Sequence, residues 1–531
     1  MADRKNFWFK FCIFIIAALG VLIRLNVLRH NFSLWHDECA LAYNIKFKTF
    51  SGLFAPLNFN QMAPPFFTLA TKITTKFLGF GEYVFRIIPF LFGCATLPAF
   101  YALSKKILNK KITVISAFAL FALNTNLIKY SCEFKPYILD VLFSIICLLF
   151  FLNLDLKSLS RKKSLIYGIL LAFLPWCSLP SVFIILAGLI ILFFKDFQLN
   201  FKNTKEEAQS KPNPSFDSGL GGKWNPPYFT NLSQALLASQ YQLIKKLVLI
   251  APIALSLLIY LKIVIMNNYS HSNYLLSFWD IAFLNKSAKS ILYVLLITLD
   301  YLLQPVRYTF FVFIFLIFSF VVMFKQKKEF AKISVLTLIL LLSASHFNIY
   351  PFASRLTLFI FPILLLTLLK PLDFISLNKK SLSLALSFLL ISFYLTAFWA
   401  FPQKVVSYLS AKTFERKEYP REMTAFIMEK IKPADVIYVN NSSDADFAYY
   451  ASFYKLKNKV IQEKIPENIT KEEYFKKLDS LKKGNYWIFA PIDFINIPVY
   501  PWLNEWASGK KILYCKKNDK KEHSLILYIE K

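Results

Sequence analysis

The feature that most constrains this chain is a series of apolar runs, each long enough to cross a lipid bilayer. A helix of about 20 apolar residues spans the hydrocarbon core. We therefore predict a polytopic α-helical membrane protein with about eleven transmembrane helices. The first run is expected to remain as an anchor, because it is long, contains Arg24 and lacks a signal-peptide cleavage site. The predicted spans are residues 7–28, 83–103, 112–129, 137–154, 164–177, 179–195, 246–265, 308–325, 331–347, 355–371 and 381–402.

The composition agrees with this class. Of the 531 residues, 56% are hydrophobic and 57 are Phe, whereas soluble proteins have about 45–50% apolar residues. The net charge of +30, from 62 Lys and Arg against 32 Asp and Glu, falls in short clusters between the apolar runs. Positive cytoplasmic loops explain this charge without nucleic-acid binding. The seven Cys residues form no CxxC pair and so indicate no metal or redox motif.

The basic clusters predict the orientation of the chain. All of them lie on one face of the membrane if the N-terminus is cytoplasmic. The first loop (residues 29–82), the link 130–136 and everything after residue 403 then lie on the outer face. Segment 288–306 could also span, but this would move the last two clusters outside, so we expect an interfacial helix on the outer face. The clusters are residues 104–111, 156–163, 325–328 and 378–380.

Two regions do not look membrane-embedded. Residues 196–245 are polar and rich in Gly, Pro and Ser, and are expected to be a mostly disordered cytoplasmic loop. Residues 403–531 are expected to form a small periplasmic α/β domain, separate from a transmembrane domain at 1–402. Helical spacing covers 471–483, and Asp444 and Asp446 look like a helix start. Short strands, the last two possibly a hairpin, are expected at 435–441, 485–491, 511–517 and 524–530.

The stretch "NFSLWHDECALAYNI" places His36, Asp37 and Glu38 side by side directly after the first apolar run. Taken alone, two acids at a helix N-terminus are a cap stabilised by the helix dipole. Further along the first loop, Gln61 precedes a Pro pair in "NQMAPPFFTLATK". This stretch indicates a fixed polar turn or an ordinary helix start with Pro in its first turn.

Three more polar stretches lie at the predicted outer ends of spans. Glu133 and Lys135 occur in "IKYSCEFKPYILD", either as a surface pair or as part of a cavity. Arg86 occurs in "EYVFRIIPF", and Arg355 in "FNIYPFASRLTLFIFP" beside Tyr350, where snorkelling is the alternative. Because all five stretches fall on the same face, we predict one polar site. Its carboxylates would act as bases and its Lys and Arg groups would hold an anion.

The order of these motifs resembles the GT-C superfamily of membrane glycosyltransferases. An acidic "DE" pair is followed by "APPFF", "FGEYVFRIIPFLFG", "SCEFKPYILDV" and "YPFASRLTLFIFP" over roughly residues 1–400. Within the superfamily, the chain looks most like bacterial relatives of protein O-mannosyltransferase and lipid A aminoarabinose transferase. The resemblance implies a bacterial inner-membrane enzyme that transfers a sugar from a polyprenyl-phosphate donor to a cell-envelope acceptor at the periplasmic face.

The resemblance also implies roles for individual residues. Asp37 matches the aspartate that activates the acceptor, and Glu38, its usual neighbour, is expected to orient substrate or partner groups, so both are candidate catalytic residues. Many relatives have His before the Pro pair, where this chain has Met62-Ala63, so no metal ligand is expected from that position. Relatives differ in their need for a metal, which leaves a divalent metal possible, but the sequence shows no His/Asp cluster of ligand spacing. Donor-phosphate contacts are expected from Lys135, Arg355 and Arg86, and pocket contacts from His36, Gln61, Glu133, Tyr137 and Tyr350.

Other functions compete with this one. A transporter or flippase of a lipid-linked or anionic solute would also place charges in the membrane, but usually at its middle and often with internal repeats. A polysaccharide ligase or polymerase, or a scaffold whose outer domain binds a partner, are further alternatives. Cys39 and Cys132 both fall on the outer face, where they could form a disulfide or stay unrelated. The sugar, the acceptor and the oligomeric state are not specified by the sequence.

Overall fold

A computed structural model describes residues 2–155, 158–194, 227–266, 276–303, 309–374, 420–440, 443–463, 469–481, 484–490, 499–508, 512–518 and 522–530. The chain divides into two compact units. Unit 1 comprises residues 1–18, 92–127 and 136–401, and unit 2 comprises residues 19–91, 128–135 and 402–531. The sequence predicted a domain border at 402/403, and a border does fall at 401/402. The first loop and the second outer link nevertheless cluster with the C-terminal domain instead of with the membrane spans.

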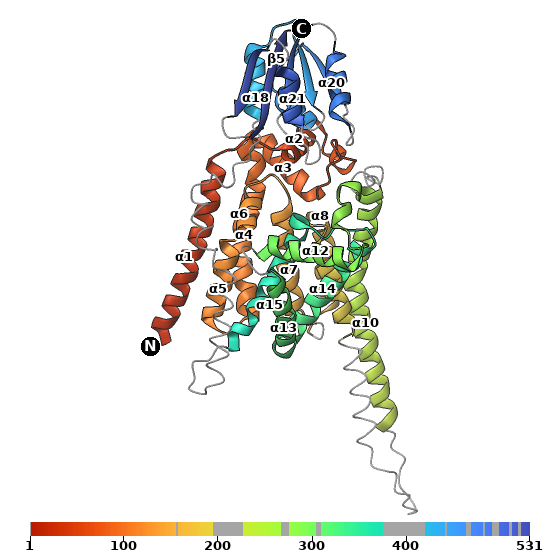
Figure 1. Cartoon of the computed structure of the whole chain (residues 1–531). Coiled ribbons are helices and arrows are strands. Elements are labelled where there is room, and N and C mark those ends of the chain that lie inside the picture. The colour runs from red at the N-terminus through yellow and green to blue at the C-terminus, as the bar shows by residue number, and fades with distance from the viewer. Residues whose placement is uncertain are drawn as a thin grey trace, which may run out of the picture. The chain divides into compact units, whose positions relative to one another are not determined.

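Helices occupy every predicted span that lies within the described residues (Figure 1). The predicted span 381–402 lies outside them. Helices α1, α4 and α6 each run from one unit into the other. The helices are α1 (Ala2–Arg29), α4 (Glu82–Ile107), α5 (Lys111–Ala122), α6 (Thr125–Ser131), α7 (Tyr137–Asn153), α8 (Arg161–Cys177), Ser181–Phe194, α10 (Pro227–Tyr260), α12 (Ala288–Leu303), α13 (Thr309–Gln326), α14 (Lys328–His346), η5 (Ser354–Ile360), α15 (Phe361–Leu369) and η6 (Lys370–Phe374).

Length and composition identify a multi-pass membrane protein. Among the described residues, six helices are long and apolar enough to cross a membrane, or seven if α5 and α6, bent by 48°, count as one span. Helix α7 and the helix Ser181–Phe194 are apolar but shorter. The polytopic class is confirmed, whereas the number of eleven spans stays a prediction.

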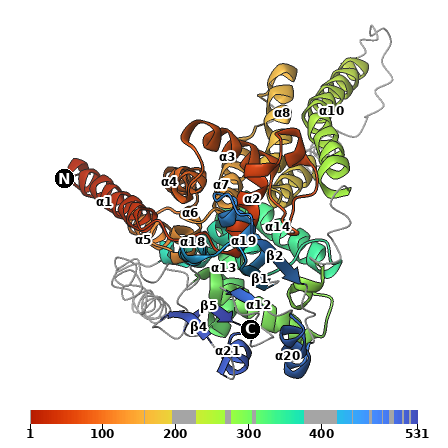
Figure 2. The ribbon, with the colours of Figure 1, turned by 90° about the horizontal axis from the view of Figure 1, so that it is seen from above.

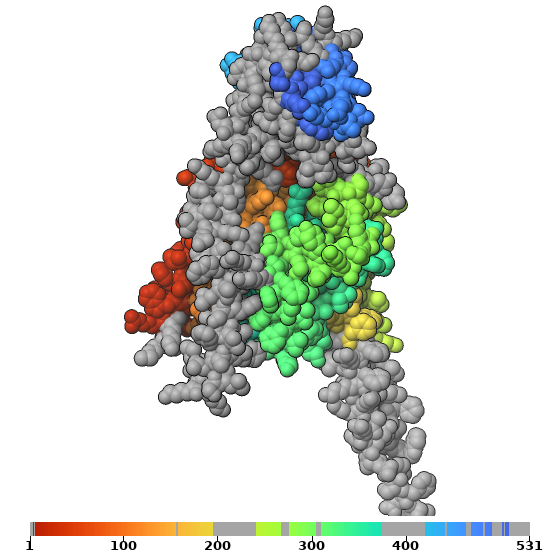
Figure 3. Space-filling view, viewed as in Figure 1, coloured from red at the N-terminus to blue at the C-terminus, as the bar shows by residue number. Residues whose placement is uncertain are grey.

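The outward surface of α13 is apolar. Phe311 is 62% exposed and Ile317 is 55% exposed. In the space-filling view, α12 and α13 form a continuous green surface (Figure 3). On a soluble protein, an exposed apolar patch of this kind marks an interaction site. On a membrane protein, such a surface contacts lipid. Inside unit 1, all nine residues of α15 are buried.

Helices α8 and α10 approach each other closely at a glycine. A Cβ atom added to Gly168 would lie 2.5 Å from the backbone oxygen of Leu249. Small residues allow this close packing between membrane helices. Helix α10 also corrects the prediction for residues 196–245, because it begins at Pro227. Its sequence "PYFTNLSQALLASQYQLIKK" has Pro at the first helical position and no later Gly, so the helix extends well beyond its apolar part. Residues 195–226 lie outside the described residues.

Within the segment 288–306, residues Ala288–Leu303 form the expected helix, α12, and its interfacial position stays a prediction. The buried Arg24 of α1 has two polar partners within unit 2: its Nε donates to Ser131 Oγ at 3.0 Å and its Nη1 donates to the Gly20 carbonyl at 2.9 Å. An arginine inside an apolar helix is costly unless it faces such partners.

The C-terminal part of unit 2 is an α/β layer structure, as predicted. Its five strands have the order β2-β1-β3-β5-β4; β2, β1 and β3 are parallel, and β5 is antiparallel to both β3 and β4. The last two strands form the expected hairpin. Strand β2 was missed, because its sequence "KVIQE" has only five residues and three of them are polar. The strands are β1 (Val436–Asn440), β2 (Lys459–Glu463), β3 (Asn485–Ala490), β4 (Ile512–Asn518) and β5 (Glu522–Glu530).

Helices cover both faces of this sheet. Alternate residues of a strand point to opposite faces, so Tyr438 packs with α20 (Lys471–Asp479) and α21 (Val499–Ser508). The neighbouring Ile437 packs on the other face with α18 (Pro420–Lys430) and α19 (Asp444–Ala451). Helix α19 also contacts α2 (His36–Phe47) of the first loop, as the view from above shows (Figure 2).

Candidate active site

The candidate site is built on the first turn of α2. Trp35, in extended conformation, is the N-cap, and the helix starts at His36, so Asp37 and Glu38 occupy its second and third positions. The Glu38 carboxylate accepts a hydrogen bond from the Trp35 N–H at 3.2 Å, which is one half of a capping box. The helix-cap interpretation therefore holds for Glu38. It does not account for Asp37 or His36.

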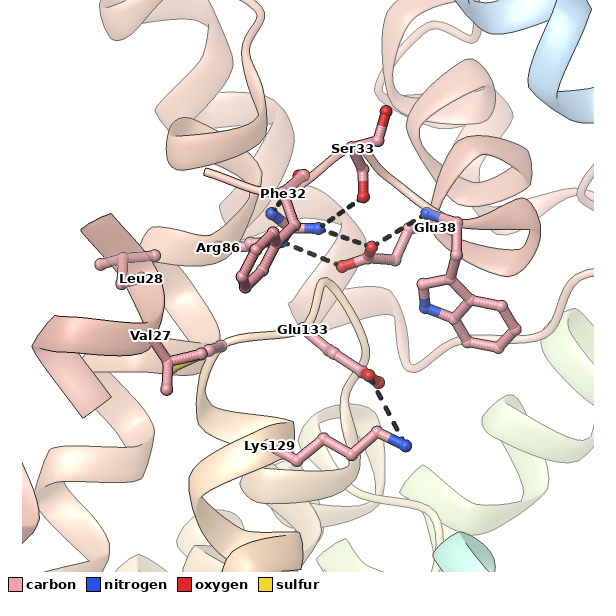
Figure 4. Close-up of a pocket in the computed structure, with 10 residues that line it drawn as sticks. Val27, Leu28, Phe32, Ser33, Glu38, Arg86, Lys129 and Glu133 are labelled. Atoms are coloured by element: carbon pink, nitrogen blue, oxygen red, sulfur yellow. Dashed lines mark hydrogen bonds and ion pairs between the residues drawn. The ribbon is translucent and has the colours of Figure 1, made fainter. Parts of the chain in front are cut away.

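Glu38 is the centre of a buried polar cluster (Figure 4). Arg86, on α4, binds it with two nitrogens: Nη2 donates to Oε2 at 2.7 Å and Nε donates to Oε1 at 3.2 Å. The backbone N–H of Phe134 also donates to Oε1. Arg86 is itself held in place, because its Nη1 donates to the Phe32 carbonyl at 2.7 Å. Three separate stretches of the chain thus meet at one carboxylate.

The cavity beside this cluster is small. It has a volume of about 20 Å³ and is lined by Glu38, Arg86, Trp35 and Glu133, among others. About 10–15 Å³ is the smallest volume that holds one water molecule. The cavity therefore has room for about one water molecule. Glu38 and Arg86 form part of its wall and are bonded to each other.

Asp37 has a different environment from its neighbour. Its carboxylate lies 3.5 Å from Lys135 Nζ, and its side chain is 21% exposed, whereas the Glu38 side chain is fully buried. Lys135 Nζ also donates to Gln61 Oε1 at 2.9 Å. The ammonium group stabilises the ionised carboxylate. Three residues that the sequence predicted from separate motifs therefore come together, with Lys135 buried and Asp37 and Gln61 partly exposed.

The turn that carries Gln61 is fixed, as one of the two interpretations of "NQMAPP" proposed. Phe59 and Asn60 both have positive φ values, of 60° and 51°. Left-handed backbone is uncommon for residues other than Gly and is often found where a loop must hold a functional geometry. Helix α3 (Pro65–Leu78) follows, with Pro in its first turn.

Glu133 has a different partner from the one that the sequence suggested. It lies 3.8 Å from Lys129, one helical turn earlier, while Lys135 turns to Asp37. Glu133 and Lys135 are 8% and 4% exposed, so the prediction of a pair on the surface was wrong.

His36 has a partner that the sequence analysis missed. Its Nδ1 lies 3.5 Å from Asp446 Oδ2, on α19, and Asp446 is fully buried. Burial alone would lower the pKa of His36, but the carboxylates of Asp446, Asp37 and Asp444 raise it to about 9. Asp444 does start a helix, as predicted. No local signal could have found the pair, because its members come from opposite ends of the chain.

The other predicted residues lie in unit 1. The Arg355 guanidinium stands 5.6 Å from the ring centres of Tyr137 and Trp279. Tyr350 donates its hydroxyl hydrogen to the Leu356 carbonyl at 2.9 Å. The structure thus groups Arg355 with the aromatic residues around it. It gathers the other seven predicted residues in unit 2.

Metal and disulfide chemistry gain no support in the described part of the chain. No group of three or more His, Cys, Asp or Glu side chains there could hold a metal ion. Cys39 and Cys132 are both buried. The Cys39 Sγ donates to the Leu34 carbonyl at 3.3 Å and the Cys132 Sγ to the Arg24 carbonyl at 3.2 Å, so the possible disulfide between them is not formed.

Comparisons with known proteins agree with this architecture. Residues 62–207 match the family model of dolichyl-phosphate-mannose-protein mannosyltransferase. The crystal structure of ArnT from Cupriavidus metallidurans in the apo state is similar, with a TM-score of 0.50 and 12% identity over 99% of this chain and 98% of that chain. ArnT from the same organism bound to undecaprenyl phosphate gives a TM-score of 0.49 and 11% identity over 97% of each chain. The comparison with curated protein sequences found no match.

The fold and the polar cluster define a multi-pass membrane protein with an attached α/β domain. The family model over residues 62–207 and the similarity in fold to ArnT agree with the resemblance to GT-C membrane glycosyltransferases that the motif order predicted. The matched residues 62–207 contain Arg86, Glu133 and Lys135, but neither the first turn of α2 nor Arg355.

Proposed function

We propose that this protein transfers a sugar from a polyprenyl-phosphate donor to an acceptor at the outer, periplasmic face of the membrane. The matching family model describes enzymes of dolichyl-phosphate-mannose, which is itself a polyprenyl-phosphate sugar. The observation that carries the proposal is the contrast between two adjacent acids. Glu38 is fully buried and paired with Arg86, while Asp37 is partly exposed and lies beside the buried ammonium group of Lys135.

Asp37 is the base in the proposed reaction. The acceptor hydroxyl or amine attacks the anomeric carbon on the side opposite the phosphate, its proton passes to Asp37, and the carbon–phosphate oxygen bond breaks. The configuration at the anomeric carbon is inverted, and polyprenyl phosphate leaves as an anion. A base must lie within hydrogen-bond reach of the proton that it accepts, and the exposed edge of Asp37 allows this approach.

Lys135 supplies positive charge beside the base. Its charge favours the ionised form of Asp37 before the reaction. It is also a candidate to stabilise the leaving phosphate, because a charged donor stabilises an anion that forms during the reaction. Arg355 remains a second proposed phosphate contact. We no longer assign Arg86 to the phosphate, since its Nε and both Nη atoms donate to Glu38 and to the Phe32 and Ser33 carbonyls.

A labelled-donor assay tests the proposal. Protein purified in detergent is incubated with a radiolabelled polyprenyl-phosphate sugar and a mixture of envelope acceptors, and free polyprenyl phosphate and labelled product are both measured. We expect both to form with the wild-type protein and neither with Asp37→Asn. A transporter or flippase would move the lipid and release no polyprenyl phosphate, so that outcome would contradict the proposal.

A further inference from the structure

The buried carboxylate of Asp446 has no part in the reaction described so far. It lies in the first turn of α19, its side chain is 0% exposed, and His36 Nδ1 lies 3.5 Å from its Oδ2. Burying a carboxylate away from water costs free energy unless a hydrogen bond or an opposite charge compensates for the lost hydration. The C-terminal domain thus places a buried negative charge directly against the first turn of α2.

A protonated His36 is unfavourable at its position in the helix unless an acidic group lies beside it. It is the first residue of α2, and a cation at a helix N-terminus is disfavoured by the helix dipole. The charged groups that face it are Asp446 and Asp444 on α19, and Asp37 on its own helix. Glu38, on the same turn, is directed to Arg86 instead. Asp446 therefore offsets the cost of a cation that stands immediately before the proposed base.

Helix α19 and the two residues that follow it contact α2 near both of its ends. At the C-terminal end, Lys46 Nζ donates to Ser452 Oγ at 2.8 Å and stands 3.4 Å from the ring centre of Phe453. At the N-terminal end, the Leu34 N–H donates to the Tyr450 hydroxyl at 2.8 Å. The His36–Asp446 pair lies between these anchors and next to Asp37. Its position lets it set the direction in which the first turn presents the base.

We propose that Asp446 is a positioning residue for Asp37 and that it acts through His36. The proposal rests on the proposed function, and it makes the C-terminal domain part of the catalytic apparatus. A displacement of about 1 Å in a reacting group can cost about a hundredfold in rate. Loss of the pair is therefore expected to lower turnover without weakening donor binding.

The test compares Asp446→Asn with wild type in the full-length protein in detergent. We expect kcat to fall about tenfold or more and the donor KM to change less than about twofold. Glu505→Gln removes an exposed carboxylate of the same domain, outside the site, and should leave both parameters unchanged. An Asp446→Asn protein that is folded and has wild-type kcat would overturn the proposal.

The pH profile separates positioning from simple support of the fold. Wild-type turnover should decline as pH rises through about 9, where His36 loses its proton. In Asp446→Asn this decline should move to lower pH, and in His36→Lys, whose ammonium stays charged to higher pH, it should move upward. An identical high-pH decline in wild type and both variants would contradict the proposed role of the pair.

A double variant covers the case in which Asp446→Asn fails to fold. His36→Gln with Asp446→Asn removes both charges and leaves neither one buried alone. If the double variant regains the wild-type melting temperature but keeps a low kcat, the pair positions the base. If it regains both the melting temperature and the kcat of wild type, the pair is only structural. A wild-type protein that transfers no sugar would overturn the proposed function. The pair itself is then still tested by the melting temperatures of the single and double variants.

Discussion

Two neighbouring regions of the first turn of α2 show how one helix can carry both a structural and a reactive carboxylate. Glu38 is fully buried and is bonded to Arg86 and to the backbone N–H groups of Trp35 and Phe134. Asp37 lies 3.5 Å from the Lys135 ammonium group, and about a fifth of its side chain is open to solvent. The two acids are adjacent in the chain but differ in what surrounds them. Burial and pairing therefore assign their roles, and the residue type does not.

The largest expected effect is loss of the proposed base. Asp37→Asn keeps the size and most hydrogen bonds of the side chain but cannot take a proton. A positioned general base contributes about 10²–10⁴-fold, so we expect kcat to fall by that factor with an unchanged melting temperature. If Asp37→Asn is present at normal levels and transfers sugar as fast as wild type, Asp37 is not the base, and the proposed difference in role between Asp37 and Glu38 is wrong.

Glu38→Gln tests the structural side of the comparison. It leaves Arg86 buried without its counter-charge, and breaking a buried ion pair costs about 3–5 kcal/mol. We expect a large drop in melting temperature and in the yield of monodisperse protein. Replacing both partners, as Glu38→Leu with Arg86→Met, should recover part of that stability. A stable Glu38→Gln protein that has lost only turnover would show that Glu38 takes part in the chemistry.

Lys135→Met removes the positive charge beside Asp37 while keeping an apolar stem of similar length. Removing one group that stabilises developing charge typically costs about 10²–10³-fold, and we expect a kcat loss near the lower end of that range. Lys135→Arg should retain more activity. A change in donor KM alone would indicate that Lys135 binds the phosphate before the reaction and does not act on the base.

The pH dependence of stability gives a smaller effect. The pKa of His36 is raised from its usual 6.5 to about 9, so the folded protein favours the protonated form. This contribution is fully present below pH 6.5 and is lost as pH rises through about 9. For a partly exposed group we expect about 2 kcal/mol. Melting temperatures between pH 6 and 10 measure it, and the Asp446→Asn curve should be flatter.

Lys129→Met should have the smallest effect. Lys129 lines the small cavity beside Glu38, but its side chain is 36% exposed and lies 3.8 Å from Glu133. Exposed helical pairs contribute about 0.3–0.5 kcal/mol. Transfer activity and melting temperature should both stay close to wild type. A large loss of activity would place the reacting groups on the Glu38 side of the turn.

Much of the fold could be predicted from local patterns. The apolar runs predicted the helices, because a run of about 20 residues needs no distant partner to form a membrane helix. The short apolar runs predicted four of the five strands, and strand β2 was missed because three of its five residues are polar. The extension of α10 to Pro227 was missed for a related reason: its first turns are polar, and no apolar run marks them.

The sequence by itself determined that Asp37 and Glu38 share one helical turn, that Lys135 and Gln61 occur near the ends of apolar segments, and that the chain crosses a membrane several times. Only the tertiary structure decided which acid is buried. Adjacent residues on a helix point about 100° apart, and the groups that meet each side chain come from distant segments. Arg86 and the Phe134 backbone enclose one acid, while Lys135 leaves the other exposed, and Asp446 reaches His36 from the far end of the chain.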